Sequence, residues 1–236
     1  KTPFQVADKE ASAAVKQSFL EVTGKYATEN DIKETQLDIT YAKNMRLTPE
    51  KIRDMDTDVE KFPEIFRTYN AKLRQMQMID YDDQMIYALR ILEQYPEVLA
   101  HFREQYRYFC VDEAQDTSKI QHAIIALLAA GTGNLFMVGD EDQSIYGFRA
   151  AYPEALLSFE KKHSGAKVLL MEENFRSNAK IVEAADKFIQ KNTLRHEKHM
   201  RAAREAGADI REISLKSRKA QYVYLMKAAQ ECTIGM

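Results

Sequence analysis

The chain has 236 residues, a formal net charge of −2 and a hydrophobic fraction of 45%, which together allow one or two domains with an apolar core. The balanced charge excludes nucleic-acid binding through an overall basic surface, so any such contact must be local. Two cysteines are too few for a disulfide framework or a zinc site. No apolar run approaches the roughly 20 residues that cross a bilayer. We therefore expect a cytoplasmic protein without membrane contact.

Residues 1–77 are predicted to be helical only. A first helix ends at Gly24 and a second spans 31–45, while Thr48 and Pro49 fit the N-cap and first residue of a third. The last helix of the region carries an amphipathic stripe with helical spacing, which indicates a packed core face. The stripe consists of Phe62, Phe66, Tyr69, Leu73 and Met76.

From residue 78 onward, apolar runs typical of strands alternate with helical patterns, which predicts a parallel sheet with helices on both faces. Cys110 lies in the first apolar run and is expected to be a small buried residue. Strands are expected at 108–111, 134–140, 167–172 and 208–215. Helices are expected at 79–95, after Pro96, up to Gly131, at 151–163, at 177–192 with Ser177 as cap, and at 217–231.

Two adjacent acids follow the first predicted strand in YFCVDEAQD, residues 108–116. Function gathers at the carboxyl ends of strands in a parallel sheet, and adjacent carboxylates there repel each other unless a cation stands by. Asp112 is a candidate ligand of a hydrated Mg²⁺, and Glu113 a candidate base for an attacking water. Alternatively, the two acids simply begin a solvated loop. An apolar run followed by Asp-Glu, taken without other motifs, favours this second interpretation.

The stretch VGDEDQSIYGFRAA, residues 138–151, also runs from an apolar strand into a polar loop. Gln143 offers a neutral amide that can contact a γ-phosphate or the water. Tyr146, Phe148 and Arg149 combine two aromatic rings with a cation, as expected for stacking bases and holding a phosphodiester backbone. An aromatic pair taken alone would more often belong to the core.

The stretch LLMEENFRS, residues 169–177, ends a third apolar run with acids followed by Arg176. The planar guanidinium of Arg176 could reach a phosphate and stabilise charge in a transition state. The alternative is a surface ion pair with Glu172 or Glu173, which would contribute little.

Together these stretches resemble the UvrD/Rep/PcrA family of superfamily 1 DNA helicases. VDEAQD matches the Walker B motif, GDEDQSIYGFRAA the GDxDQSIYxxRGA motif, and ENFRS the NYRS motif. IDYDDQM (79–85) is similar to the family's DFDDL segment, where the chain returns to the motor domain. AKNMRLTPEKI (42–52) is similar to part of the helical insertion that precedes it. The resemblance covers nearly the whole chain and is far more specific than a lone glycine motif.

For nucleotide chemistry, the resemblance implies that ATP and Mg²⁺ are the cofactors. Asp112 corresponds to the magnesium aspartate and Glu113 to the catalytic glutamate. Gln143 corresponds to the γ-phosphate sensor that links hydrolysis to DNA, and Arg176 to the first of two arginines on the γ-phosphate. These residues are therefore the expected catalytic and cofactor-binding set.

For DNA, the resemblance implies single-stranded or 3′-tailed duplex substrates and protein partners in DNA repair. Gln115 and Asp116 would link the nucleotide site to the coupling loop. Ala150 departs from the family, which usually has Gly there, and its β-carbon would tighten a turn. The implied DNA-binding residues are Tyr146, Phe148 (at a stacking position usually held by Trp) and Arg149.

The phosphate cradle G-x-x-x-x-G-K-[ST] is missing, since none of the eight glycines fits it. The chain is therefore expected to be a fragment with three parts: an all-helical inserted subdomain (1–77), the back half of a RecA-like, P-loop NTPase motor domain (78–177) and the beginning of a second motor domain (178–236). The expected fold is α/β, with a partial RecA-like parallel sheet flanked by helices. Without the cradle, the chain alone is expected not to hydrolyse ATP at a useful rate.

Three functions stay open at this point. The first is part of an ATP-dependent 3′→5′ DNA helicase or translocase. The second is the helicase part of an AddA- or RecB-type helicase–nuclease, which shares these motifs. The third is a non-catalytic DNA-binding protein with a degenerate motor fold, against which the presence of Asp112, Glu113, Gln143 and Arg176 argues.

Overall fold

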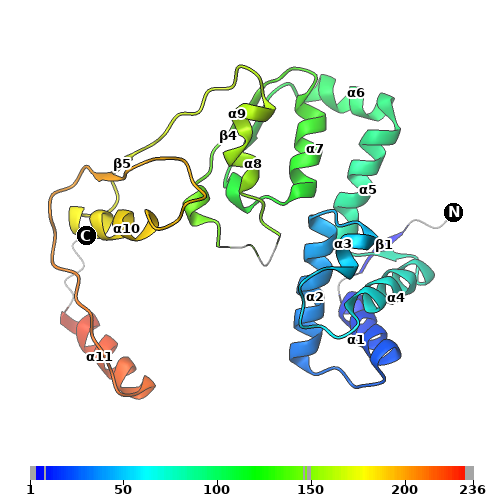
Figure 1. Ribbon diagram of the computed structural model, residues 1–236, viewed down its shortest axis with the longest axis horizontal. Helices are drawn as coiled ribbons and strands as arrows, with labels where there is room; N and C mark the ends of the chain where they lie inside the picture. Colours follow the sequence, from blue (N-terminus) through cyan, green and yellow to red (C-terminus); the bar gives the residue numbers. More distant parts are fainter. Residues whose placement is uncertain (1–3, 8, 146, 148–149, 232–236) are drawn as a thin grey trace. The chain divides into compact units, whose positions relative to one another are not determined.

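The computed structural model describes residues 4–7, 9–145, 147 and 150–231. Within it the chain forms two compact units, Lys1–Val168 and Leu169–Met236 (Figure 1). None of the helices in the described ranges combines the length and apolar character that a membrane span requires.

The amino-terminal part of the first unit is a cluster of helices, as predicted (Figure 1). Gly24 ends the first helix with a φ of +73°, a value that glycine adopts without strain. The Thr48 side chain accepts a hydrogen bond from the Lys51 backbone N–H, and Pro49 begins the helix. The stripe is confirmed at Phe62, Tyr69 and Leu73, which are buried in the core of this cluster, and Phe66 packs against it partly buried. Met76, at the end of the stripe, is exposed, so its predicted burial is wrong. The helices are α1 (Lys9–Thr23), α2 (Glu29–Asn44), α3 (Pro49–Arg53) and α4 (Phe62–Gln75).

A short strand precedes the helices of this region, so the prediction of helices only is wrong. Strand β1 (Gln5–Val6) pairs in parallel with β2 (Met78–Ile79). The backbone N–H of Ala7 extends the pairing by donating to the carbonyl of Ile79 at 2.8 Å. A two-residue strand leaves no alternating pattern in the sequence, because alternation needs about four residues to be visible.

The rest of the first unit packs helices around one parallel strand pair. Strand β3 (Phe109–Val111) pairs with β4 (Leu135–Met137) in the register Cys110↔Phe136, which confirms the first two predicted strands. The predicted helix at 151–163 is divided at Ser158. The helices are α5 (Tyr81–Gln94), α6 (Pro96–Gln105), α7 (Lys119–Ala129), α8 (Glu154–Leu157) and α9 (Phe159–Lys162), with short 3₁₀ turns η1 (Ala114–Asp116) and η2 (Glu141–Gln143).

One face of the β3–β4 pair is exposed, which corrects the expectation that Cys110 is buried. Cys110 is an exposed free thiol, and its partner Phe136 is 62% exposed. Side chains alternate between the two faces of a strand, so Cys110 and Phe136 share a face while Val111 and Met137 share the other. Only the latter face is partly covered.

The described part of the second unit, up to residue 231, contains one more parallel pair and two helices. The expected strands at 167–172 and 208–215 are not formed. The cap of α10 is Asn178, whose side chain accepts from the Ile181 N–H, rather than Ser177. The elements are β5 (Glu173–Asn174), α10 (Ala179–Ile189), β6 (Arg201–Ala202) and α11 (Arg218–Glu231).

The fold is therefore α/β, with helices and short parallel strand pairs. The described strands form three separate two-stranded pairs, so a RecA-like sheet is not seen as such. The division at residues 77 and 177 remains a prediction, as does the RecA-like identity of the second part.

Candidate functional site

Two polar loops leave the same edge of the β3–β4 pair. The backbone N–H of Val138 donates to the carbonyl of Val111 at 2.8 Å, and that of Ala114 donates to Val138 at 2.9 Å. The two chain segments therefore stay hydrogen-bonded beyond the strands themselves. The first loop carries Asp112 and Glu113, and the second carries the sequence GDEDQ. Parallel pairing thus brings together two motifs that are separated in sequence.

Glu113 has an unusual backbone conformation. Its φ of +47° and ψ of +44° lie in the left-handed region, which costs free energy for a residue with a β-carbon. Asp112 Oδ1 accepts a hydrogen bond from the Glu113 backbone N–H at 3.0 Å. Both carboxylates lie at the surface. The turn therefore presents both acids to solvent at the strand end, at the cost of local strain.

Gln115 joins the two loops through its buried side-chain amide. Its Nε2 donates to Glu113 Oε2 at 2.7 Å, and its Oε1 accepts from the backbone N–H of Asp140 at 2.9 Å. Its backbone carbonyl accepts from Ser144 Oγ at 3.3 Å. A β-carbon on Gly139 would lie only 2.8 Å from Gln115 Oε1. Glycine is therefore what allows the second loop to approach the amide this closely.

Gln143 lies at the far end of the same hydrogen-bonded chain. Its Nε2 donates to Asp140 Oδ2 at 2.7 Å, and its backbone N–H donates to the Asp140 carbonyl at 2.9 Å. A continuous path thus runs from Glu113 through Gln115 and Asp140 to Gln143. The sequence had not indicated Asp140, although its place directly after the strand-end glycine was a usable signal.

Arg176 lies in the second unit, so its approach to Asp112 remains a prediction. Its backbone N–H donates to Asn174 Oδ1 at 3.0 Å, in a turn that also leads into α10. The guanidinium found near Glu172 is that of Arg201, at 3.9 Å. The alternative interpretation paired Arg176 with Glu172 or Glu173, whereas in the structure the basic neighbour of Glu172 is Arg201.

Tyr146, Phe148 and Arg149, the predicted DNA contacts, lie outside the described residues. Of the neighbouring described residues, the Ala150 N–H donates to the Gly147 carbonyl at 2.9 Å. Ala150 has a φ of +63° and is fully buried. The position where the resemblance expects glycine is therefore one whose backbone favours glycine.

The Asp112 loop suits a magnesium ion better than a metal held by protein ligands alone. Among the described residues, no group of three or more His, Cys, Asp or Glu side chains could hold a metal. Magnesium is usually bound through one or two carboxylates together with waters and substrate phosphates. The exposed carboxylate of Asp112 fits that role, with Glu113 beside it.

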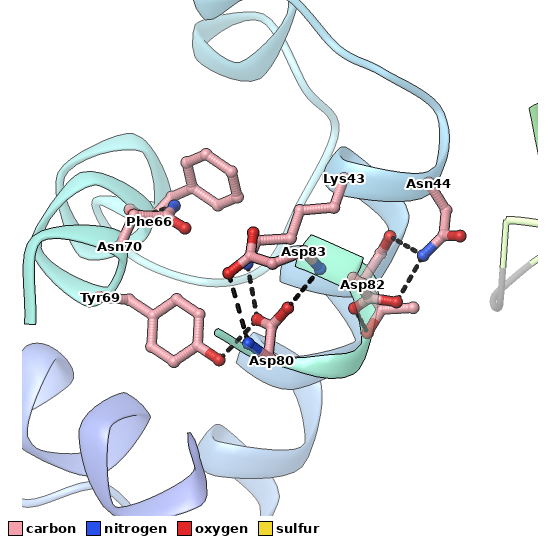
Figure 2. A network of polar contacts seen from close by, with 9 residues as sticks. Lys43, Asn44, Phe66, Tyr69, Asn70, Asp80, Asp82 and Asp83 are labelled. Carbon is pink, nitrogen blue, oxygen red and sulfur yellow. Dashed lines mark hydrogen bonds and ion pairs between the residues drawn. The ribbon is translucent and has the colours of Figure 1, made fainter. Parts of the chain in front are cut away.

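A second polar cluster, buried between α2, α4 and the start of α5, was not expected from the sequence. Lys43 Nζ lies 2.6 Å from Asp80 Oδ2 and 2.8 Å from Asp83 Oδ1, and the Lys43 side chain is only 2% exposed. The Tyr69 hydroxyl donates to Asp80 Oδ2 at 2.8 Å, while Lys43 Nζ lies 5.2 Å from the Tyr69 ring centre. Figure 2 shows these side chains converging from three elements.

The same cluster fixes the beginning of α5. Asp80 is the N-cap and accepts from the Asp83 N–H at 2.7 Å. Asp82 accepts hydrogen bonds from Thr40 and Asn44 on α2, at 2.8 and 2.7 Å (Figure 2). Burial nevertheless raises the pKa of the Asp82 carboxyl. The two segments singled out at 42–52 and 79–85 therefore meet in space.

Burial and the charge of Asp80 also raise the pKa of the Tyr69 phenol, which favours the protonated hydroxyl that donates to Asp80. With Lys43 and Tyr69 both donating, the Asp80 carboxylate has partners suited to its charge. The cluster is thus a satisfied buried network, with a structural role rather than a catalytic one.

Comparison with known proteins agrees with this geometry. Residues 1–164 match the family model described as the UvrD/REP helicase N-terminal domain. The chain is 33% identical over 191 residues to the ATP-dependent DNA helicase PcrA of Staphylococcus epidermidis, covering 80% of this chain and 26% of that protein.

Two further relatives show the same pattern. The PcrA helicase of Leuconostoc citreum is 38% identical over 159 residues, which cover 66% of this chain and 21% of the relative. A probable DNA helicase II homolog of Rickettsia felis is 35% identical over 192 residues, covering 79% and 29%. The chain thus spans only about a quarter of the length of these curated relatives.

Proposed function

This chain belongs to the UvrD/REP helicase family, and from that membership we propose that it is part of an ATP-driven motor moving 3′ to 5′ on single-stranded DNA. The observation that carries the proposal is the hydrogen-bonded path from Glu113 through Gln115 and Asp140 to Gln143. The path connects Glu113 in the first loop to the amide of Gln143 in the second. A motor needs such a connection to transmit the effect of hydrolysis from the nucleotide site to the DNA-binding loop.

In this proposal, the first loop activates water. A magnesium ion at Asp112 would neutralise phosphate charge when bound. Glu113 accepts the proton of the attacking water, and the Gln115 amide holds the Glu113 carboxylate in the orientation that this step needs. The strained backbone of Glu113 supports the assignment, because such strain is concentrated at functional sites.

The second loop reads the nucleotide and the DNA. Gln143 contacts the γ-phosphate, and a change in its position reaches Glu113 through Asp140 and Gln115. Arg176 supplies a further positive charge on the phosphate. Base stacking and backbone contacts are assigned to Tyr146, Phe148 and Arg149 on the same loop.

We expect this chain alone to be inactive in ATP hydrolysis, because its sequence offers no phosphate cradle for the β- and γ-phosphates. Phosphate release measured with Mg²⁺, ATP and single-stranded DNA should stay at the background rate. Turnover of about 1 s⁻¹ or more, the low end of ordinary enzymes, would contradict the fragment proposal.

The motor assignment itself is tested in the full reading frame that encodes this chain. We expect DNA-stimulated ATP hydrolysis there, and its loss in Glu113→Gln with nucleotide binding retained. A Glu160→Gln variant, which changes an exposed acid on α9, is the matched control. Equal rates for the two variants would remove Glu113 from the water-activating role.

A further inference from the structure

A tyrosine between two lysines forms a basic surface beside the candidate site. Lys119 Nζ lies 5.9 Å and Lys162 Nζ 5.7 Å from the centre of the Tyr152 ring. Lys119 is the first residue of α7 and Lys162 the last of α9, so the two ammonium groups come from different elements. The aromatic ring attracts both cations.

We propose that Lys119, Lys162 and Tyr152 contact the phosphodiester backbone of single-stranded DNA, an inference that rests on the DNA-binding function proposed above. Two converging ammonium groups around an aromatic ring form an electropositive surface, which single-strand binding proteins combine with stacking side chains. The surface follows closely after the predicted DNA contact Arg149 in the sequence. A DNA strand held at Arg149 therefore has a second anchoring point within reach along the chain.

The position of Lys119 at the start of α7 is unfavourable for the helix itself. The amino end of a helix carries a partial positive charge, so an acid would stabilise α7 at this position and a lysine does not. The ion pairs found among the described residues include neither Lys119 nor Lys162. Two cations without a carboxylate partner are available for an external anion.

The pKa of His122 is sensitive to the positive charge of the same surface. Its ring packs edge-on against Tyr152, with centroids 6.3 Å apart. Burial, followed by the charge of Lys162, lowers the pKa of the His122 imidazole. A phosphate bound at Lys162 would offset that charge.

The surface is fixed to the loop that carries the acids. The Tyr152 backbone N–H donates to the Thr117 carbonyl at 2.9 Å, and Ser118 forms an antiparallel bridge with Ala151. Thr117 Oγ1 in turn donates to the carbonyl of Ala114 at 2.7 Å. A strand of DNA at Tyr152 would thus be connected, through the hydrogen bonds of Thr117, to the turn that positions Asp112 and Glu113.

The test measures binding of a fluorescein-labelled oligothymidylate to the chain by anisotropy. Lys119→Gln/Lys162→Gln is compared with Lys161→Gln/Lys167→Gln, which removes the same charge from two other exposed lysines. Each phosphate contact on a single strand contributes about 0.7 to the slope of log affinity against log salt, so two contacts contribute about 1.4. Between about 50 and 200 mM salt, the wild type should lose roughly sevenfold more affinity than the first double variant.

The outcomes separate this surface from the function on which it rests. If both double variants bind like each other, the surface is rejected while DNA binding stands. If the wild type does not bind the oligonucleotide even at low salt, both proposals fail for this chain. If the wild type and Lys119→Gln/Lys162→Gln show equal slopes of log affinity against log salt, the two ammonium groups contact no DNA phosphate, and the surface is rejected.

Discussion

The side-chain amide of Gln115 donates a 2.7 Å hydrogen bond to the carboxylate of Glu113, two residues earlier in the chain. The other end of the same amide accepts from the backbone of Asp140 in the neighbouring loop. One buried side chain therefore sets the relative positions of both loops. Its environment is the most direct place to test the site.

We predict that Gly139→Ala destabilises the chain by about 1–3 kcal/mol, the usual cost of overpacking. The added β-carbon would lie 2.8 Å from both Gln115 Oε1 and Leu156 Cδ1, and 3.1 Å from a backbone nitrogen, so the loop must shift. Urea unfolding measures the loss. Gly147→Ala is the control, because, apart from its chain neighbours, no atom of the described residues lies within 4 Å of its β-carbon position. A similar loss in both variants would refute the packing argument.

Lys43→Met should destabilise the chain by about 3–5 kcal/mol, because it leaves the buried carboxylates of Asp80 and Asp83 without their cation. The exposed Lys25, paired with Glu60 at the surface, provides the comparison. Lys25→Met should leave the midpoint of thermal unfolding unchanged, since solvent screens such pairs. Comparable shifts for the two variants would mean that the buried network contributes no more than a surface pair.

Ala150→Gly is expected to stabilise the chain by about 1 kcal/mol, because alanine is strained in the left-handed conformation and glycine is not. Ala150 has a φ of +63°. The neighbouring buried Ala151, which is not among the residues with positive φ, should lose stability when changed to glycine. Calorimetric melting of both variants tests the pair, and a lower melting temperature for Ala150→Gly would contradict the strain.

The free energy of unfolding should decrease as the pH falls below 6.5, because His122 is harder to protonate in the folded chain than in the unfolded chain. The folded chain holds the pKa of this imidazole below its ordinary value of 6.5, chiefly by burial and then through the charge of Lys162. The unfolded chain therefore binds the proton first, so the stability present above pH 6.5 is lost progressively below it. In His122→Gln this part of the pH dependence should be absent from urea unfolding curves.

A second readout addresses the cause of that shift. Lys162→Gln removes a nearby positive charge and should move the pKa of His122 upward, which an NMR titration of the ring protons measures. Lys161→Gln is the control on the same helix. An unchanged His122 titration in Lys162→Gln would assign the whole effect to burial.

Local signals in the sequence predicted the helices well. Thr48 and Pro49 specify a helix start through their own side chains, and Gly24 specifies an end through its backbone freedom. These effects act within a few residues, so no knowledge of the tertiary fold is needed. The cap of α10 was assigned one residue too early, to Ser177 instead of Asn178, because both residue types accept the same hydrogen bond.

Strands were predicted less well, because a strand exists only with a partner. The segment 167–172 had the right composition, yet no strand forms there, and among the described residues only Glu172, at its end, has a backbone hydrogen bond to the next pair, from the Arg201 N–H. Cys110 was expected to be buried because its neighbours in sequence are apolar, but it is exposed. Burial depends on which elements cover the strand pair, and the sequence of the strand does not specify them. The pairing of Gln5 with Met78 likewise depends on residues far apart in sequence.

For the candidate site, the strand-end acids and Gln143 were predicted from residue type and position, and the structure places them on adjacent loops. The path between them through Asp140 was not predicted, because a backbone N–H carries no mark in the sequence. Lys43 was missed for a related reason: a lysine among helical residues is typical of a solvated surface, and only the fold shows that it pairs with two aspartates, Asp80 and Asp83.

The Lys43 network also limits how this protein could be rebuilt. The helical cluster α1–α4 cannot be exchanged independently of α5. Lys43 and Tyr69 in the cluster donate hydrogen bonds to the carboxylates of Asp80 and Asp83 at the start of α5. A graft from a relative would have to carry all four residues together, or replace all four by side chains that match in volume and polarity.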